Sequence, residues 1–464
     1  MMRSLYAGVA GLKTHQTKMD VIGNNIANVN TVGFKSTSVT FSELMYQTTS
    51  NASGANALTG TGGINAKQIG LGVTMGATNV NITTAGATQT TGNPFDLKIK
   101  GDSFFIVSDG TNRFFTKAGA FYVDGSGNLA MTSTGYNVMG WQVDETTGNI
   151  KEDTVSPLKI MQAKNMTSNP EATTLARCEG IIDRADSNVT SDTGKTLSLN
   201  FYDALGYSYT AKFAIKDTDV RGEYTITLSD ILNSQNKSIT EYYDTDALEN
   251  IVGFNGTDGY TIKFNTDTGL FEGIFPTGGT AGTDKAAVLD FAEGLTTQGR
   301  EDLTLLNFSD ISIDFSNTKW FDNNETSTIG MEAGDADKKG AGKVLGALSG
   351  ISIDNSGKIY GTYDNGNTKL LGQIAVASFA NPAGLEKVGE NLYQVTLNSG
   401  EFDGIGKNVT ADGGSMSTGV LEMSNVDLSA EFTEMITTQR GFQANSRIIT
   451  TSDTLLEELI NLKR

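Results

Sequence analysis

The chain has 464 residues, which at about 150 residues per domain corresponds to roughly three domains. It carries 34 Lys and Arg against 53 Asp and Glu, a formal net charge of −19, and this charge disfavours nucleic acid or an anionic membrane as a partner. The single cysteine excludes an intramolecular disulfide. The single histidine excludes a histidine-rich metal site and disfavours a Ser-His-Asp triad.

The N-terminal residues, MMRSLYAGVAGLKTHQ, lack the apolar core and the small-residue cleavage site of a secretory signal peptide. No stretch of the sequence approaches 18 consecutive apolar residues, so no membrane-spanning helix is predicted. If the protein leaves the cell, we expect a route that does not cleave a signal peptide.

An amphipathic helix is predicted from residue 3 to about residue 29. Its apolar stripe is narrow, and it consists of residues spaced seven apart, namely Leu5, Leu12, Met19 and Ile26, with Val9 and Ile22 widening it. Such a stripe needs a partner helix to cover it.

Strand patterns dominate the middle of the chain. The Gly- and Thr-rich residues 54–92 predict extended chain with loops. Residues 97–150 and 349–398 show short apolar runs separated by glycine turns, and we expect them to join in one discontinuous β-domain. The residues between these stretches form a β-rich insertion, in which 195–217 predict a pair of strands.

A second long helix is predicted at the C-terminus, from residue 428 onwards. We expect Ser424 and Asp427 to form a capping box at its start. The apolar residues of this helix again recur every seven positions, at Leu428, Met435, Phe442, Ile449 and Leu456. The column of residues next to them is interrupted by Gln439, Ser446 and Asp453, which make the helix too polar for a simple two-stranded coil.

Two interpretations of the terminal helices remain open. They form an ordinary bundle with each other, or they pair and also pack against other copies of the chain, and the polar column favours the second. In both cases the predicted fold class is mainly β with α-helical termini, with nested discontinuous β-domains and a coiled-coil pair formed by the N- and C-terminal helices.

The predicted domain organisation is nested along the sequence. Residues 1–30 with 425–464 form the coiled coil, 31–70 with 405–424 an extended linker, 71–154 with 347–404 a discontinuous inner β-domain, and 155–346 one or more inserted outer β-domains.

No string in the sequence completes a catalytic, cofactor-binding or metal-binding motif. Residues 194–196 (Gly-Lys-Thr) lack the earlier glycine of a phosphate-binding loop, because Val189 stands there. The turn that begins at Asp124 resembles a calcium loop but has Leu129 where glycine is required. We therefore predict no enzyme activity, no cofactor and no metal.

His15 and Cys178 are each the only residue of their type. His15 lies near the apolar stripe of the first helix, where a structural or interface role is favoured over a ligand role. Cys178 is either a small buried hydrophobe or, because Arg177 and Glu179 flank it, a partly exposed and reactive thiol.

Segments at both ends of the chain resemble the terminal signatures of bacterial flagellar rod and hook proteins. These segments are QTKMDVIGNNIANVNTVGFK (16–35) and MSNVDLSAEFTEMITTQRGFQANSRIITTSDTLLEELINLKR (423–464). Between them, GDSFFIV, FTKAGAFYVDGSGNL, GKIYGTYDNG and IAVASFANPAGLEKVGENLY are similar to segments of hook proteins.

The resemblance implies a structural subunit that assembles with itself, as a helical homopolymer, into the curved and flexible hook that transmits torque from rod to filament. The heptad residues of both helices would then form the assembly seam. The implied partners are the hook cap protein, the distal rod protein, the hook-filament junction protein and the flagellar type III export apparatus. The implied location is the extracellular flagellum, with no nucleic-acid or membrane partner.

Spirochete hook proteins of this family join neighbouring subunits through a lysinoalanine cross-link between a cysteine and a lysine. The resemblance makes Cys178 and Lys164 the candidates for such a cross-link. The cysteine would lose its sulfur by elimination to give dehydroalanine, which a neutral lysine amine of the next subunit would then attack.

Two other functions remain open. A distal rod protein shares both terminal signatures, but usually lacks a large outer insertion. A secreted β-rich adhesin, from a different class, would not need the two helical seams.

Overall fold

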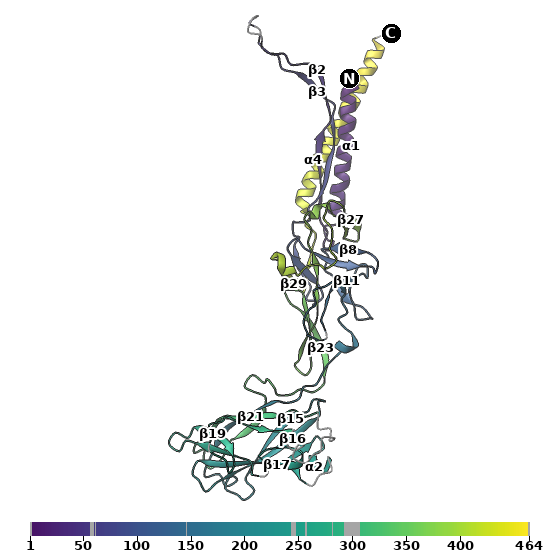
Figure 1. Ribbon diagram of the computed structural model, residues 1–464. Coiled ribbons are helices and arrows are strands. Elements are labelled where there is room, and N and C mark those ends of the chain that lie inside the picture. Colours follow the sequence, from purple (N-terminus) through teal and green to yellow (C-terminus); the bar gives the residue numbers. More distant parts are fainter. Residues whose placement is uncertain are drawn as a thin grey trace. The chain divides into compact units, whose positions relative to one another are not determined.

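The computed structural model describes residues 2–55, 60, 62–144, 146–242, 247–255, 258–280, 282–291 and 307–462. The chain divides into two compact units: unit 1 comprises Met1–Asn165, Gly350–Gly361 and Lys369–Arg464, and unit 2 comprises Met166–Ser349 and Thr362–Thr368. The fold is mainly β with one long helix near each end of the chain (Figure 1), which confirms the predicted fold class. No described helix is long and apolar enough to cross a membrane.

The two long helices of unit 1 are α1 (Met2–Ala27) and α4 (Leu428–Asn461), and they lie antiparallel (Figure 1). Asp427 is the N-cap of α4, because its carboxylate accepts hydrogen bonds from the backbone N–H groups of Ser429 and Ala430. The predicted capping box is therefore wrong: Asp427 satisfies the first-turn donors by itself, and Ser424 precedes the helix.

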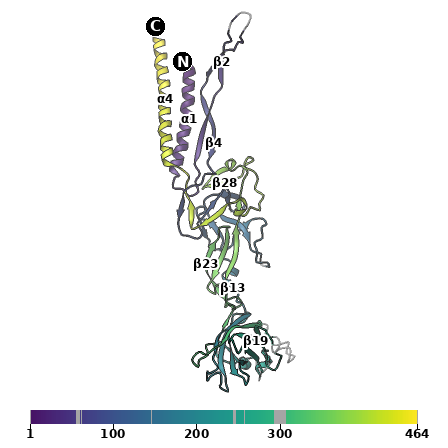
Figure 2. The same ribbon diagram turned by 90° about the vertical axis from the view of Figure 1, so that its left-hand side faces the viewer.

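A two-stranded ribbon lies beside α1 (Figure 2). In it, β1 (Thr37–Glu43) pairs antiparallel with β4 (Val73–Val80), and β2 (Tyr46–Ser50) pairs with β3 (Lys67–Gly70). These residues were predicted to be mostly linker. They are extended but paired, because Thr- and Val-containing runs on both sides of the glycine-rich segment favour strand pairing.

The main sheet of unit 1 is built from two stretches that are far apart in sequence. Its strand order is β24-β25-β11-β7-β8-β28-β27, and the β11–β25 and β8–β28 pairs join the two stretches as predicted. The bounds are β7 (Phe104–Ser108), β8 (Arg113–Thr116), β11 (Asn137–Gln142), β24 (Lys358–Tyr363), β25 (Thr368–Ile374), β27 (Glu386–Gly389) and β28 (Leu392–Gln394). Joined to this path are β9 (Phe121–Val123), β10 (Leu129–Met131), β12 (Ser156–Pro157) and β26 (Val376–Ala377).

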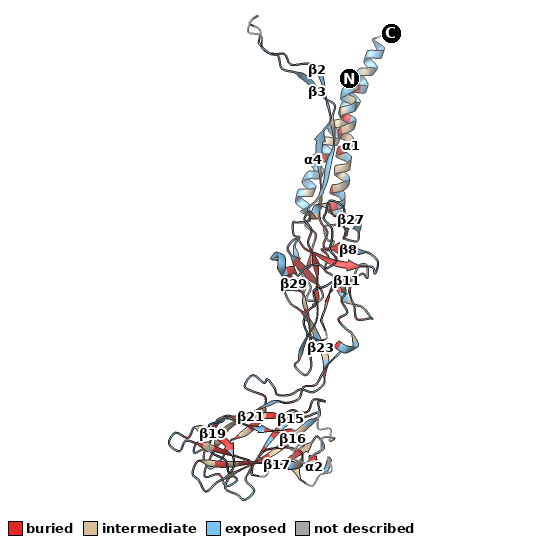
Figure 3. Ribbon diagram, viewed as in Figure 1, coloured by how far each residue is buried: buried red, intermediate tan, exposed pale blue. Residues whose placement is uncertain are grey.

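Two short ladders bring the residues before α4 back to the N-terminal half of unit 1. In them, β5 (Thr88–Thr90) pairs with β30 (Val420–Glu422), and β6 (Leu97–Lys100) pairs with β29 (Ser415–Thr418). The buried residues of unit 1 concentrate in the main sheet, whereas α4 and the ribbon are largely exposed and α1 mixes exposed and intermediate positions with a few buried ones (Figure 3).

Unit 2 contains two sheets around one hydrophobic core. The first is an antiparallel meander of β15 (Lys195–Tyr202), β16 (Ser208–Asp217), β17 (Glu223–Asn233), β18 (Tyr260–Phe264) and β19 (Phe271–Pro276). Its first two strands confirm the strand pair predicted at 195–217. The second has the order β20 (Ala286–Leu289), β21 (Ile311–Trp320), β14 (Leu175–Ile182) and β22 (Gly330–Ala333). Shorter elements are β13 (Thr167–Ser168) and α2 (Ile239–Tyr242). The strand β23 (Gly346–Ile353) lies next to β24 and continues the main sheet.

Candidate assembly interface

The contact between α1 and α4 depends on small residues. A Cβ atom added to Gly11 would lie 2.6 Å from Nδ2 of Asn445, and one added to Gly441 would lie 2.7 Å from Cε1 of His15. Since real Cβ atoms need more space than this, glycine at these positions allows the two helices to approach closely.

The face of α4 that turns toward α1 follows a heptad pattern. Residues shielded from solvent recur at alternating spacings of four and three, at Glu431, Met435, Thr438, Phe442, Asn445, Ile449, Ser452 and Leu456, and Gly441 and Ser446 beside this series are also partly shielded. Every second member is a large apolar residue that the sequence identified. The others are small or polar, and Thr438 and Ser452 are the most buried. The fifth predicted seam residue, Leu428, is exposed.

In α1 the four predicted seam residues are all half-buried, at Leu5, Leu12, Met19 and Ile26. The more deeply buried positions are Gly8, Gly11, Thr14, Ile22 and Asn25. Apart from Ile22, which widens the predicted stripe, sequence reasoning missed this face because a glycine that allows close helix contact leaves no hydrophobic signal. Only its spacing of three and four residues could have indicated it.

Two polar contacts set the register of the helix pair. Nδ2 of Asn25 donates to Oε1 of Glu431 at 2.9 Å, and Nζ of Lys18 lies 3.0 Å from Oε2 of Glu434. Burial raises the pKa of Glu431. Because the Lys18–Glu434 pair is partly exposed, it contributes specificity more than stability.

A buried polar clamp joins the inner ends of both helices to the β-structure of unit 1. Nζ of Lys35 lies 2.8 Å from Oε1 of Glu422, and both side chains are almost fully buried. The same Glu422 oxygen accepts the backbone N–H of Gly86, and Lys35 also donates to the carbonyl of Thr84. Each member of the pair thus has a further hydrogen bond to the backbone, which helps to offset the cost of burying the two charges.

Asn425 completes the clamp from the residues just before α4. Its Oδ1 accepts the backbone N–H of Ser36 at 2.7 Å, and its Nδ2 donates to the carbonyls of Asn81 and Thr84. On the other side, Asn25 of α1 exchanges hydrogen bonds with the backbone of Thr37. The clamp thus fixes how both helices leave the β-structure.

His15 lies where α1, α4 and the ribbon meet. Its ring packs against Gly441 of α4 and makes an edge-to-face contact with Phe41 of β1, with 5.7 Å between ring centroids. Nδ1 is buried and has no hydrogen-bond partner among the described residues. Burial and the nearby Lys18 ammonium lower the pKa of His15. The ring therefore acts here as a neutral packing group.

The outer faces of the helix pair and the ribbon carry many exposed large apolar residues. On the helices these are Tyr6, Val9, Leu428, Phe432, Ile436, Ile448, Leu455, Leu459, Ile460 and Leu462. On the ribbon they are Phe41, Leu44, Met45, Tyr46, Ile64, Ile69, Leu71 and Met75. A two-stranded ribbon is only marginally stable alone in water, and concentrated exposed apolar residues mark an interaction surface.

Cys178 lies in the core of unit 2, on β14. Its side chain is fully buried, and burial raises the pKa of its thiol. Of the two alternatives, the small buried hydrophobe is confirmed and the partly exposed thiol is wrong, because alternation along the strand turns Arg177 and Glu179 outward while Cys178 faces the core. Lys164, its predicted partner, lies in the 3₁₀ turn Ala163–Asn165.

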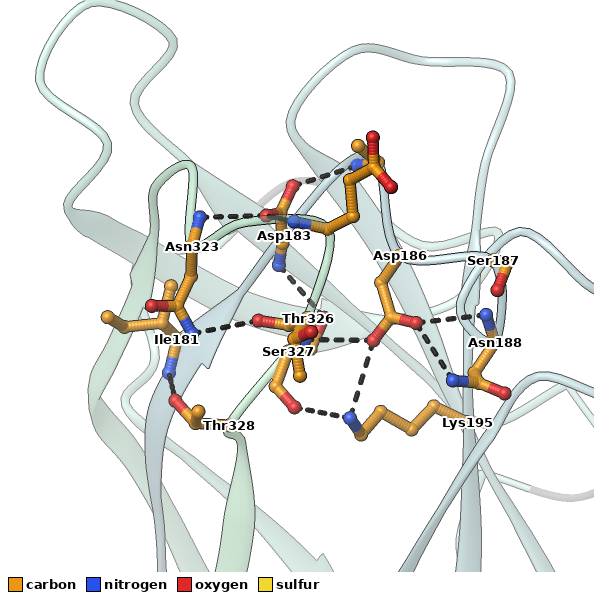
Figure 4. A network of polar contacts seen from close by, with 12 residues as sticks. Ile181, Asp183, Asp186, Ser187, Asn188, Lys195, Asn323, Thr326, Ser327 and Thr328 are labelled. Atoms are coloured by element: carbon orange, nitrogen blue, oxygen red, sulfur yellow. Dashed lines mark hydrogen bonds and ion pairs between the residues drawn. The ribbon is translucent and has the colours of Figure 1, made fainter.

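Two buried carboxylates tie the loops of unit 2 together (Figure 4). Asp183 accepts backbone N–H groups of Asn323 and Glu325, and Asp186 accepts the N–H of Ser327 at 2.9 Å. Backbone hydrogen bonds of this kind lower the pKa of Asp183, and they outweigh the opposing effect of burial on the pKa of Asp186. Within the described ranges no cluster of metal-ligating side chains occurs. The hydrogen bonds of Asp183 and Asp186 connect two loops of unit 2 and have a structural role.

Comparison with known proteins identifies the two ends and the inner β-region. Residues 5–35 match the family described as "Flagella basal body rod protein", 98–169 match "Flagellar hook protein FlgE/F/G D1 domain", and 417–462 match "Flagellar basal body rod FlgEFG protein C-terminal". The chain is 36% identical over 474 residues to flagellar hook protein FlgE of Borreliella burgdorferi, covering 100% of both chains. The chain belongs to the flagellar hook protein family.

Other relatives support this membership. Flagellar hook protein FlgE of Treponema pallidum is 35% identical, and flagellar basal-body rod protein FlgG of Bacillus subtilis is 30% identical, each over 100% of both chains. The crystal structure of Helicobacter pylori flagellar hook protein FlgE2 is similar with a TM-score of 0.39 at 13% identity, over 71% of this chain and 98% of that chain. A likeness at this score supports no inference about the fold. The adhesin alternative is not favoured by these relatives.

Proposed function

We propose that this hook-family chain is the hook subunit, and that its terminal helices and ribbon carry the contacts between copies. The observation that supports this most directly is the apolar surface that the helix pair leaves exposed. Large apolar residues such as Phe432 and Ile436 face outward, although the inner face already holds large apolar residues that alternate with small and polar ones. A helix pair that only had to stabilise one chain would place these residues inside.

The distribution of apolar surface suggests how such a tube could bend. Each large apolar side chain buried between copies contributes about 1.5–3 kcal/mol, so the helical region would hold the tube together. Polar contacts between exposed β-surfaces are individually weak and can be exchanged as the tube turns. Strong inner contacts with weak outer contacts give a tube that transmits twist and still bends.

The partners and location of the chain follow from the same proposal. As a hook subunit it would add beneath the hook cap protein, join the distal rod protein at one end and the hook-filament junction protein at the other, and reach its place through the flagellar type III export apparatus. Its role is structural, with no enzyme activity. The four-part division of the sequence, with terminal coiled coil, linker, inner β-domain and outer insertion, would then run from the channel to the outside.

Substitution of one exposed helix residue tests the proposal. Ile436→Lys places a charge on the outer face without disturbing the α1 contact, and we expect it to abolish tube formation, observed by electron microscopy, while circular dichroism still shows folded β-structure. Leu205→Lys, at an equally exposed leucine of unit 2, is the control and should assemble. Normal tubes from the Ile436→Lys protein would refute the assignment of the contacts.

Genetic complementation separates the hook function from that of the rod. We expect the chain to restore the hook in a strain that lacks its own hook protein, and not to restore the rod in a strain that lacks its distal rod protein. The reverse result would show that the chain is a rod subunit.

A further inference from the structure

The α1–α4 contacts run residue by residue in opposite directions. His15 lies against Gly441, and seven positions earlier Gly8 lies within reach of Ile448. Each position toward the start of α1 therefore corresponds to one position further along α4. By this relation residue 2, the first residue of α1, lies opposite residue 454. Because α4 ends only at Asn461, its last two turns extend past the start of α1, as Figure 1 shows.

These last two turns are strongly apolar, and most of their large side chains are exposed. Leu459 is 52% exposed and Ile460 is 67% exposed. Leu459 lies at the next three-residue step of the heptad seam after the half-buried Leu456, and α1 no longer lies opposite Leu459. We call residues 455–462 the overhang; its apolar members are Leu455, Leu456, Leu459, Ile460 and Leu462.

A second apolar surface lies at the other end of the same helix. Leu428, Phe432 and Ile436 are spaced four apart, so they share one face of the first turns of α4. Phe432 is 49% exposed and Ile436 is 60% exposed. We call these three residues the N-terminal patch. The inner face of α4 beside them is already occupied by α1, through contacts such as Asn25–Glu431.

We propose that the overhang of one subunit packs on the N-terminal patch of α4 in the next copy of the chain. The two surfaces lie near opposite ends of one straight helix, so they cannot meet within one chain. Because they differ from each other, a contact between them is head-to-tail and repeats without closing, as a tube requires. The overhang also continues the α1–α4 seam. The next copy would therefore cover the apolar face of α4 that extends past the start of α1. This inference rests on the proposed hook function.

The geometry sets the axial distance between the two copies in contact. Residue 458, near the centre of the overhang, is 26 positions from Phe432, at the centre of the patch. At 1.5 Å per helical residue this corresponds to an axial offset of about 39 Å.

Disulfide trapping tests the contact directly. In a Cys178→Ala background, which removes the only native thiol, L459C and F432C are introduced into the same chain, and the assembled tubes are oxidised. A head-to-tail contact should give a ladder of covalent dimers, trimers and longer oligomers in a denaturing gel. Each single-cysteine variant should give no ladder, and L205C combined with F432C is the matched control that should also give none.

The outcomes separate this inference from the proposed function. Tubes without a ladder would overturn the inference and leave the hook function standing, and dimers from L459C alone would show a symmetric overhang–overhang contact instead. If the double variant forms no tubes, the pair L462C with L428C, at the edges of the two surfaces, takes its place. If the unaltered chain forms no tubes on purified hook seeds, the proposed function itself fails.

Discussion

The buried Lys35–Glu422 pair is surrounded by more ammonium groups than carboxylates. Lys98 and Lys117 are also buried near it. Lys98 donates to the carbonyl of Gly86, and burial lowers the pKa of Lys117 to about 8. Glu422 is therefore the carboxylate that neutralises this part of the clamp.

Removing that carboxylate should be costly. Glu422→Gln leaves the Lys35 ammonium buried without a counter-charge, and we expect it to lower the free energy of unfolding by about 3–5 kcal/mol, measured by urea titration. Glu434→Gln, which breaks only the exposed pair with Lys18, should cost less than about 1 kcal/mol. Equal losses in the two variants would contradict the role given to the clamp.

Two glycines of α1 offer a matched comparison. A Cβ at Gly11 would lie 2.6 Å from Asn445, whereas a Cβ at Gly23 meets no atom within 4 Å. We expect Gly11→Ala to destabilise the helix pair by about 1–3 kcal/mol through overpacking, and Gly23→Ala to stabilise it by about 0.5–1 kcal/mol through helix propensity. Thermal loss of helical circular dichroism measures both. A stabilising Gly11→Ala would mean that the helices are not in close contact there.

At the residue scale, the sequence predicted the large side chains and missed the small ones. The spacing of Met435, Phe442, Ile449 and Leu456 was enough to identify the apolar column of α4, because heptads leave a visible hydrophobic pattern. The contacts of Gly8 and Gly11 are defined by the absence of a side chain, so no hydrophobic pattern can show them. For Cys178 the flanking charges suggested exposure, but strand alternation decides burial.

At the scale of elements, the meeting of α1, α4 and β1 at His15 makes the assembly region sensitive to acid. The folded chain favours neutral His15, because its Nδ1 is buried without a partner and its pKa is lowered. As the pH falls below about 6.5, the unfolded chain therefore takes up a proton before the folded one, and folding stability decreases.

We expect the thermal midpoint of the helices to fall between about pH 7.5 and about pH 5.5, a range above the usual titration of carboxylates. In His15→Gln, which has no titrating ring, the fall should be smaller. A His15→Gln protein with an unchanged pH dependence would show that another group is responsible.

The existence and type of the main elements could be read from the sequence, but their pairing partners only in part. The strands at 195–217 pair through a tight turn, which is a local signal. The β1–β4 pairing joins residues on both sides of a glycine-rich segment, and such a non-local pairing depends on packing against α1 that no local pattern encodes. The start of α4 shows the same limit, because which of two capping residues is used depends on the incoming chain.

At the scale of the whole molecule, the proposed cross-link between Cys178 and Lys164 depends on opening a core. Elimination at Cys178 would remove its α-proton and release hydrogen sulfide, and the lysine amine of the next subunit would then add to the resulting double bond. Because Cys178 is fully buried in the single chain, this can begin only after β14 is exposed or rearranged.

We therefore expect purified single chains to keep an intact thiol at Cys178 and assembled hooks to contain the cross-linked peptide. Mass spectrometry of proteolytic peptides from both preparations measures this, with a Lys164→Arg chain as the control that should lose the cross-linked peptide. Hooks that contain only unmodified Cys178 would contradict this prediction.

The nested order of the chain was predictable because each half of the inner sheet has its own strand pattern and each end has its own helix. The division of unit 2 into sheets was not predictable from the sequence. Its two sheets share one hydrophobic core, and β14 pairs in parallel with β21 across more than a hundred residues, a connection for which sequence spacing gives no signal.

The polar contact between Asn25 and Glu431 joins residues that are 406 positions apart in the sequence. Closing so long a loop is slow compared with forming local strands, and it requires residues from both extremities of the polypeptide. A chain that is still being synthesised or threaded through a pore has no finished helix pair and therefore no docking surface for a neighbour. If the helix pair carries the contacts between copies, as proposed, a chain that lacks either long helix should not be able to add to a tube.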